Sequence, residues 1–438
     1  MRSEDDGAAT SRLVAGQGSQ ESGHSFICGG VIVLAFEGQT ISNKPLRFLF
    51  VKNHLAWPRS SGHDVHSFNL MRSLGEQGHA LALLTASEPT DQALAGLRLE
   101  TRWTFDQAPA PAPEIPLSLT RWQEKFRSYW GIEPETIRTV AYFSREFQAD
   151  AVVVAGLEVL PYLAGVTGAQ RIWYAADEWV WHHWSLVQWS RPSTWSQLRQ
   201  AAIKGLYERA YGPMLDRVWV VTDADARAMR WVTKYPQIDV IPNGVDSAYF
   251  HPVAVTPEPN TCTFWGRLDF EPNIQGLEWF CERVWPLVQQ QRPEARFTIY
   301  GFQPTPAALA LTKNHNVQII PNLPDLREET ARHAVVVLPF VSGGGIKNKL
   351  LEAASLGRAI VCSPRAVQGL HYDGDAPFAI CRRPWDWVVN ILRLWDDDDQ
   401  RRRLGSAARQ WVLKHHTWDQ AARRAVAGLL QAKQGLTR

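Results

Sequence analysis

The feature that most constrains this chain is an alternation of short apolar runs with longer segments of helical periodicity, which occurs twice along the sequence. Such an alternation is typical of βαβ units stacked around a parallel sheet. At 438 residues the chain is longer than a single core usually grows, since domains commonly hold about 100 to 200 residues. The pattern therefore predicts an α/β protein with two parallel-sheet domains in tandem.

Short apolar runs are predicted as strands on both sides of a proline-rich break. The break holds four prolines and little periodicity, as an interdomain linker does. The predicted strands are 47–51, 79–85, 151–155, 171–175, 217–221 and 239–242, followed by 262–266, 296–301, 317–320, 335–339, 359–362 and 377–381. We therefore expect a first domain at 45–241, a linker at 242–261 and a second domain at 262–416.

The two ends of the chain have a different character. Residues 1–44 are rich in Ser, Gly, Gln and acidic residues outside one apolar run, and we expect them to form a poorly ordered leader. The apolar run at 26–36 has the length of a signal-peptide core, but acidic residues precede it, whereas export signals carry net positive charge there. Residues 417–438 are predicted to include a final helix that could pack back on the first domain.

Composition disfavours several classes of protein. The 46 basic and 44 acidic residues give a formal charge of +2, so no global field favours nucleic acid as a partner. The five cysteines lie far apart and form no Cys-x-x-Cys pair, which indicates buried thiols in a reducing cytoplasm. No run approaches the roughly 20 apolar residues that a membrane-spanning helix needs. The sequence therefore predicts a cytoplasmic protein without a transmembrane segment.

The most informative segment, 335–357, is predicted as a buried strand, a glycine loop and a helix that begins near Gly345. Ligands of parallel sheets bind beyond the carboxyl ends of the strands. Gly343, Gly344 and Gly345 allow a backbone to approach a phosphate closely, and the amide groups that open a helix favour an anion. The loop lacks the Walker spacing, and no dinucleotide fingerprint follows a strand. We predict a phosphate site here, and neither ATP hydrolysis nor hydride transfer is favoured.

Two charged residues, Lys349 and Glu352, share one face of this predicted helix at a spacing of three residues. Lys349 can pair with a phosphate as a point charge. Glu352 can accept two hydrogen bonds from vicinal hydroxyls, such as those of a ribose. The alternative interpretation is an ordinary ion pair on a solvated helix face.

Several blocks of the sequence, in order, resemble the glycosyltransferases of the GT-B fold, in particular the large family 4. They are SSGHDVHSFNLMRSLGEQGHALALLT, IPNGVDSAYF, FWGRLDFEPNIQGLEWF and GGGIKNKLLEAASLG. The resemblance covers roughly residues 45–434, and the last two blocks carry most of its specificity. It implies two Rossmann-like domains that face a cleft, with the nucleotide-sugar donor on the second domain and the acceptor on the first.

Carried over to this chain, the resemblance implies a set of donor and acceptor residues. The donor diphosphate would contact Arg267, next to Gly266, and a lysine, while Glu352 would bind the ribose. The glycine near the opening helix of the first domain, Gly62, would face the acceptor side of the cleft together with His63. The resemblance also implies an enzyme without a bound metal or other cofactor, whose nucleotide sugar is a substrate.

Two departures from the family pattern concern the donor site. The Glu-x7-Glu signature places an acid eight positions before Glu352, where this chain has Gly344. The lysine that often follows the Gly-Arg-Leu loop is also missing, and Asn273 lies nearby instead. Lys347 or Lys349 is expected to supply that charge.

The segment YAADEWVWHH follows a predicted strand of the first domain and carries Asp177, Glu178, His182 and His183. If the transfer inverts the anomeric centre, the acceptor hydroxyl needs a base, and we assign that role to Asp177. The alternative is that Asp177 caps the following helix or pairs with a basic side chain. The two histidines lack further ligands at a recognisable spacing, so no metal site is predicted.

Tryptophan is dense between 173 and 195, with six residues in that stretch. Tryptophan faces can carry sugar rings, and tryptophan is favoured at membrane interfaces, where a lipid-linked acceptor would lie. The alternative is that most of these rings fill the core. We therefore carry a peripheral contact with the inner face of the membrane as an expectation.

The sequence thus predicts a cytoplasmic glycosyltransferase that uses a nucleoside-diphosphate sugar and a glycan or lipid-linked acceptor. Two alternatives stay open. A nucleotide-sugar epimerase or phosphorylase can share the fold, because a fold does not determine a reaction. A catalytically silent sugar-nucleotide binder is the other, on account of Gly344.

Overall fold

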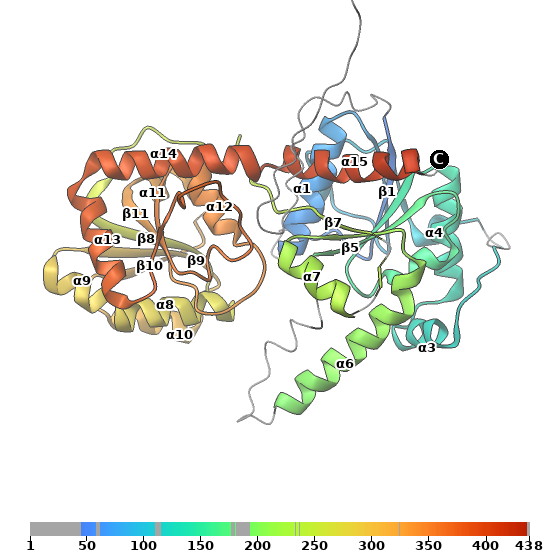
Figure 1. Cartoon of the computed structure of the whole chain (residues 1–438), viewed down its shortest axis with the longest axis horizontal. Helices are drawn as coiled ribbons and strands as arrows, with labels where there is room; N and C mark the ends of the chain where they lie inside the picture. Colours follow the sequence, from blue (N-terminus) through green and yellow to red (C-terminus); the bar gives the residue numbers. More distant parts are fainter. Residues whose placement is uncertain are drawn as a thin grey trace, which may run out of the picture. The chain divides into compact units, whose positions relative to one another are not determined.

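The structure, a computed structural model, describes residues 45–57, 62–109, 115–176, 180, 193–232, 234–235, 237–323 and 325–435. The described chain contains two parallel sheets with helices packed against them, each the sheet of a βαβ domain (Figure 1). The α/β class predicted from the alternating pattern is therefore confirmed. Residues 1–44, where the leader is expected, lie outside the described part.

The first sheet has seven parallel strands in the order β3-β2-β1-β4-β5-β6-β7. Their bounds are β1 Arg47–Lys52, β2 Ala80–Thr85, β3 Thr101–Thr104, β4 Ala151–Ala155, β5 Gln170–Ala176, β6 Arg217–Val220 and β7 Ile238–Val240. Six match predicted runs, but β3 does not. Its four residues, TRWT, are mostly polar and lie at the sheet edge, so they lack the apolar run by which the others are recognised.

Helices follow the strands of the first sheet and cover it. They are α1 Gly62–Glu76, α2 Asp91–Leu94, α3 Arg121–Tyr129, α4 Pro134–Glu146, α6 Ser193–Tyr211 and α7 Asp223–Val232, with the 3₁₀ turns η1 Phe105–Gln107, η2 Leu160–Gly165 and η3 Gly212–Met214. The central strands are buried on both faces, and all five residues of β4 are buried. Continuous apolar runs are what such doubly covered parallel strands require.

The second sheet has six parallel strands in the order β10-β9-β8-β11-β12-β13. They are β8 Glu258–Arg267, β9 Arg296–Phe302, β10 Val317–Pro321, β11 His333–Leu338, β12 Ala359–Cys362 and β13 Ala379–Ile380. All six match predicted runs. The strand β8 begins at Glu258, which lies inside the expected linker, because its first residues pair with β11 through His333 and Glu258.

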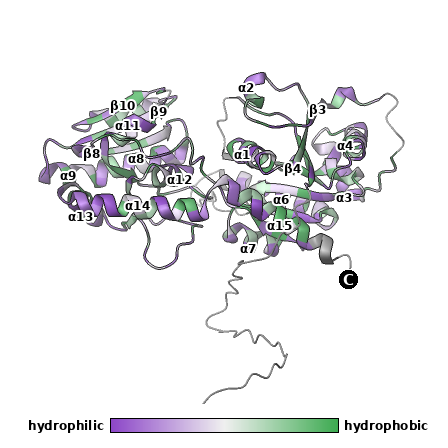
Figure 2. Cartoon of the chain, turned by 90° about the horizontal axis from the view of Figure 1, so that it is seen from above, coloured by the Kyte–Doolittle hydropathy of each residue, from purple (hydrophilic) through white to green (hydrophobic). Residues whose placement is uncertain are grey.

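The helices of this half are α8 Glu271–Arg283, α9 Trp285–Gln291, α10 Pro306–Ala310, α11 Arg327–Ala331, α12 Asn348–Ser355, α13 Pro384–Asp396, α14 Asp398–His415 and α15 Trp418–Gly435, with the turn η4 Leu311–Lys313. In Figure 2, α14 and α15 show alternating hydrophilic and hydrophobic bands, as helices with one buried face do. The last helix, α15, packs against α1 of the first half, where Gln77 Nε2 donates to Asp419 Oδ1 at 2.7 Å.

The strand order reverses at one place in each sheet. In the first sheet the reversal lies between the neighbours β1 and β4, and in the second between β8 and β11. Loops that follow the two strands at such a switch point diverge and leave a crevice at their carboxyl ends, where parallel sheets bind ligands. These two switch points are therefore the places to look for function.

Candidate functional site

The switch point of the second sheet carries the glycine loop, which connects β11 to α12. Gly343 and Gly345 adopt left-handed backbone angles, with φ of +88° and +65°. These angles are incompatible with an α-helix, so the prediction that the helix begins near Gly345 is wrong: α12 begins at Asn348. Gly344 faces open space, since a Cβ built there meets nothing within 4 Å.

Lys347 is engaged by the loop that precedes it. Its ammonium donates to the carbonyl oxygens of Gly343 at 3.0 Å, of Gly344, and of Gly345 at 3.3 Å. Lys347 thereby holds the three glycines in a tight turn. Of the two lysines expected to supply the donor-side charge, this one is occupied with backbone carbonyls.

Lys349 reaches across the end of the neighbouring strand β8. A Cβ on Gly266 would lie 2.2 Å from Cε and 2.8 Å from Nζ of Lys349, so the lysine side chain passes directly over a backbone that lacks a side chain. Gly266 also has φ of +150°. Within the described ranges no oxygen accepts a hydrogen bond from this ammonium, and burial lowers the pKa of Lys349 against the opposing charge of Glu352. The result is a partly buried cation that donates to no hydrogen-bond acceptor of the described residues.

Glu352 lies one turn further along α12 and is held by the same strand. Trp265 Nε1 donates to its Oε2 at 2.7 Å. Burial raises the pKa of the Glu352 carboxyl, and the Trp265 hydrogen bond and the Lys349 charge partly oppose that rise. An ordinary ion pair on a solvated face does not describe this arrangement, because both side chains are partly buried and Glu352 bonds to another strand.

Arg267, the last residue of β8, lies at the exposed rim of the switch point. Its guanidinium forms a two-pronged ion pair with Asp269, with Nη2 to Oδ2 at 2.6 Å and Nε to Oδ1 at 2.9 Å. Asn273 Nδ2 donates to the Arg267 carbonyl at 2.6 Å, while its Oδ1 is buried without a described partner. Our reading of the sequence missed the Asp269 pair, although the acid two positions after Arg267 in the Gly-Arg-Leu-Asp run was the signal for it.

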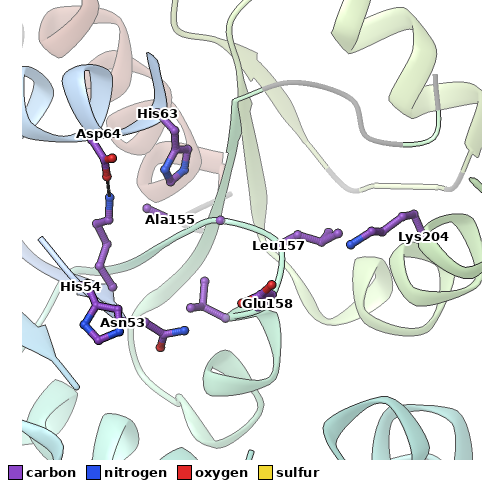
Figure 3. A pocket seen from close by; sticks show the side chains of 11 residues that line it. Asn53, His54, His63, Asp64, Ala155, Leu157, Glu158 and Lys204 are labelled. Atoms are coloured by element: carbon purple, nitrogen blue, oxygen red, sulfur yellow. Dashed lines mark hydrogen bonds and ion pairs between the residues drawn. The ribbon is translucent and has the colours of Figure 1, made fainter. Parts of the chain in front are cut away.

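The switch point of the first sheet holds a pocket of about 340 Å³, shown in Figure 3. The ends of β1 and β4, the start of α1 and one residue of α6 line it. The lining residues are Lys52, Asn53, His54, His63, Asp64, Ala155, Gly156, Leu157, Glu158, Val159 and Lys204. Pockets of this size with a few convergent polar groups are the usual form of small-ligand sites.

A buried ion pair forms one wall of this pocket. Lys52, at the end of β1, donates through Nζ to Asp64 Oδ1 at 2.7 Å and to Ser67 Oγ at 3.3 Å (dashed line to Asp64 in Figure 3). The Lys52 side chain is 6% exposed and that of Asp64 is 18% exposed. Sequence reasoning missed this pair. Its signal was a lysine at the end of an otherwise apolar strand, followed by an acid in the first turn of the next helix.

His63, predicted on the acceptor side, lines the pocket from α1. Its ring stacks on Tyr174 of β5 with centroids 5.2 Å apart and planes 10° from parallel. Its Nε2 is buried and has no hydrogen-bond partner in the described part of the chain. Burial, with help from the Lys52 charge, lowers the pKa of His63 to about 4. The ring is therefore neutral at physiological pH. Gly62, the other predicted acceptor-side residue, is the first residue of α1.

Several predicted positions fall outside the described residues. They are Asp177, Glu178, Trp179, Trp181, His182, His183, Trp184 and Trp189. The two described tryptophans of that stretch differ: Trp173 is fully buried and donates to the Gly156 carbonyl at 2.9 Å, whereas Trp195 is 77% exposed. Among the residues that the structure describes, no group of three or more His, Cys, Asp or Glu could hold a metal ion.

Comparison with known proteins bears on the second half directly. Residues 259–397 match the family model described as glycosyl transferases group 1. This range contains β8, the glycine loop and α12. The expected resemblance is thus confirmed for the segment that carries Gly266, Arg267, Lys349 and Glu352. A sequence search of curated proteins gives no match.

Solved structures share the fold of the whole described chain. TarM matches with a TM-score of 0.65 at 12% identity over 89% of this chain and 100% of its own. Sucrose-phosphate synthase from Thermosynechococcus elongatus matches with 0.62 at 15% over 90% and 100%. Anabaena HepE, solved with UDP and glucose, matches with 0.59 at 11% over 88% and 99%. The predicted GT-B fold, with its two Rossmann-like sheets, is therefore confirmed.

Proposed function

We propose that this protein is a glycosyltransferase that moves a sugar from a nucleoside-diphosphate sugar to a hydroxyl of a glycan or lipid-linked acceptor. One observation carries the proposal. At the switch point of a sheet that matches the group 1 glycosyl transferases, a partly buried lysine without a hydrogen-bond partner in the described chain lies beside a strand-anchored carboxylate. A nucleoside diphosphate carries both an anion for the lysine and a ribose diol for the carboxylate.

On the donor side, Lys349 would bind the diphosphate and the backbone of the glycine loop would approach it closely. The carboxylate of Glu352 would accept hydrogen bonds from the ribose, with Trp265 fixing its orientation. Arg267 would contact the diphosphate from the exposed edge of the site, where Asp269 holds its guanidinium in place. Lys347 would shape the loop through the carbonyls it binds. Anion binding by Lys349 would offset the desolvation that now disfavours its charge.

During transfer, the bond between the anomeric carbon and the diphosphate breaks, and a bond from the acceptor oxygen to that carbon forms while the hydroxyl loses its proton. Negative charge develops on the departing diphosphate, and cations placed beforehand stabilise it. We assign this role to Lys349 and Arg267, with no resident metal. Asp177 remains our proposed base if the reaction inverts the anomeric centre.

On the acceptor side, we propose that the pocket at the first switch point receives the hydroxyl. Its two lysines face two acids of the lining: Lys52 pairs with Asp64, and the Glu158 charge acts on Lys204, so the pocket wall does not demand an anion. His63 lines the same pocket with a neutral ring, so it adds no charge to the wall. Both features suit an uncharged sugar hydroxyl.

We propose a cytoplasmic location, which the four described cysteines support. Cys262, Cys281, Cys362 and Cys381 are all free and buried. Unpaired thiols are typical of proteins from reducing compartments.

The proposal is tested by incubating the full chain with labelled nucleoside-diphosphate sugars and an extract of glycans and lipids. Labelled acceptor, with release of nucleoside diphosphate, is the expected result. Isomerised donor without acceptor labelling would instead identify an epimerase, and donor binding without turnover would identify a silent binder. Neither alternative is favoured by the comparisons. Failure of every nucleotide sugar to bind would overturn the proposal.

A further inference from the structure

The exposed face of α6 carries aromatic, aliphatic and cationic side chains in one stripe. Trp195, Arg199, Ala202, Leu206 and Arg209 follow one another at intervals of three and four residues, so they lie on one side of the helix. All five are exposed. The buried side chains of α6 lie on the opposite side and are Ala201, Tyr207, Glu208 and Tyr211. The stripe is therefore an outward surface of a helix that is anchored by its other face.

This stripe meets the end of α7, which lies beside α6 (Figure 1). Arg209 Nε donates to the carbonyl oxygen of Val232 at 2.9 Å, so the last turn of α7 adjoins the end of the stripe. That turn carries Trp231, which is 82% exposed, while Trp195 is 77% exposed. These two side chains are the most exposed large apolar groups of the described residues. Trp195 and Trp231 thus lie toward the two ends of the stripe, and exposed apolar groups of this size are typical of interaction surfaces.

The same surface carries positive charge that no acid of the described residues offsets. No carboxylate in the described ranges lies within ion-pair distance of Arg199, Arg209 or Arg230. The single acid of α6, Glu208, is fully buried and accepts a hydrogen bond from the Tyr235 hydroxyl at 3.0 Å. By contrast, several exposed arginines of the second domain pair with acids, such as Arg296 with Glu258 and Arg402 with Asp399. The surface on α6 and α7 is thus cationic as well as aromatic.

We propose that this surface, formed by the α6 stripe with Arg230 and Trp231, docks on a membrane rich in anionic lipid. Tryptophan is favoured at the level of the lipid headgroups, and arginine binds anionic headgroups while its stem covers apolar surface. A helix whose outward face carries both apolar and cationic side chains is suited to lie in the plane of the interface. No described helix could span a bilayer, so the contact would be peripheral.

Membrane docking at this surface does not depend on sugar transfer, because it rests on α6 and α7 alone. Of the tryptophan-rich stretch 173–195, Trp195 belongs to the proposed membrane-docking surface, whereas Trp173 is buried in the core. Vesicle binding and glycosyl transfer can therefore fail independently of each other.

The test is co-sedimentation of the full chain with vesicles of phosphatidylcholine alone and with vesicles that also contain phosphatidylglycerol. The double variant Trp195→Ser with Arg199→Gln removes one aromatic and one cationic group from the stripe. The matched control, Trp385→Ser with Arg382→Gln, removes an exposed tryptophan and a nearby exposed arginine of the second half. Near-ultraviolet circular dichroism and size-exclusion chromatography establish that each variant folds and keeps its oligomeric state.

We expect the wild-type chain to bind the anionic vesicles and not the neutral ones. The α6 variant should lose affinity by on the order of tenfold, since one arginine near an anionic surface accounts for about fivefold and the tryptophan adds to it. The control should bind like the wild type. No binding to anionic vesicles, or equal losses in both variants, would overturn the proposal. So would an α6 variant that binds vesicles normally but changes oligomeric state, because the surface would then be a protein interface.

Discussion

The two switch points have the same topology, but the lysine at each of them makes different contacts. In the first sheet, Lys52 comes from the strand itself and its charge is matched by Asp64 at 2.7 Å. In the second sheet, Lys349 comes from the helix after the glycine loop, and the adjacent Glu352 bonds to Trp265 instead. One lysine completes an internal ion pair, and the other is left with a hydrogen-bonding capacity that the described chain does not fill.

This difference indicates which kind of ligand group each crevice can bind. A matched pair keeps a pocket wall neutral and rigid, which suits a hydroxyl. A desolvated cation without a partner costs stability until an anion arrives, and such costs concentrate at functional sites. One fold thus holds a structural lysine and a binding lysine, and the same substitution at both positions should have opposite effects on stability.

The largest effect is expected for Lys52→Met. Removing one partner of a buried pair leaves Asp64 uncompensated, so the free energy of unfolding should fall by about 3 to 5 kcal/mol. Urea-induced unfolding of the variant and the wild type measures the loss. The double variant Lys52→Met with Asp64→Asn should recover part of it, because the orphaned charge is gone. An unchanged stability for Lys52→Met would show that this pair is not a structural one.

Lys349→Met is expected to weaken binding of a nucleoside diphosphate by about 30- to 100-fold, since a hydrogen bond to a charged group contributes about 2 to 3 kcal/mol. Because burial lowers the pKa of Lys349, the folded state disfavours its charge, and the neutral variant should be slightly more stable at pH 7. Isothermal titration calorimetry and urea unfolding check the two effects. Lys313→Met, at an exposed lysine of the same half, should change neither. A loss of stability in Lys349→Met would show that Lys349, like Lys52, has a structural role.

Gly266→Ala should expel the Lys349 side chain, because the new methyl group would lie 2.2 Å from its Cε. We expect donor affinity to fall by about tenfold or more and stability to fall by about 1 to 3 kcal/mol, as overpacking and a strained backbone angle do. The control is Gly344→Ala, where the added methyl group meets nothing within 4 Å and should leave stability unchanged. Equal stability of both variants would contradict the crossing of Lys349 over the strand.

The smallest effect concerns the pH dependence of Glu352. Its folded pKa is raised above 4.5 by burial, so its stabilising contribution is present in acid and is lost as pH rises through the folded value. Glu352→Gln should therefore be more stable than the wild type at pH 7, by about 1 kcal/mol or less. The difference should vanish near pH 4, while Glu282→Gln, at an exposed site, should show no such trend. A pH-independent difference would show that Glu352 is not desolvated.

Most of the fold could be predicted from the sequence, because parallel strands that are covered by helices on both faces consist of continuous apolar runs. Twelve of these runs became strands, whereas the polar edge strand β3 has no such signature. Within the run of acids at 396–399, Asp397 caps α14 and accepts a hydrogen bond from the Gln400 backbone amide. A helix cap of this kind depends on only a few neighbouring residues, so it can be predicted from the sequence.

The two sites could be predicted only in part, because they depend on contacts between segments that are distant in the sequence. The sequence identified Lys349 and Glu352 as candidates, but it did not show that Lys349 crosses Gly266, 83 positions earlier, or that Trp265 holds the carboxylate. It also suggested a helical start for the glycine loop, since it could not reveal the left-handed angles of Gly343 and Gly345. Tertiary packing decides which of two neighbouring lysines remains available for a ligand.

The most direct test of the account is a crystal structure of the chain with a nucleoside-diphosphate sugar. We predict a phosphate oxygen at about 3 Å from Lys349 Nζ and a ribose hydroxyl at hydrogen-bond distance from the Glu352 carboxylate. Lys347 should keep its bonds to the loop carbonyls. A nucleotide bound elsewhere, or one whose phosphates contact Lys347 and not Lys349, would show that Lys349 is not the donor-binding lysine.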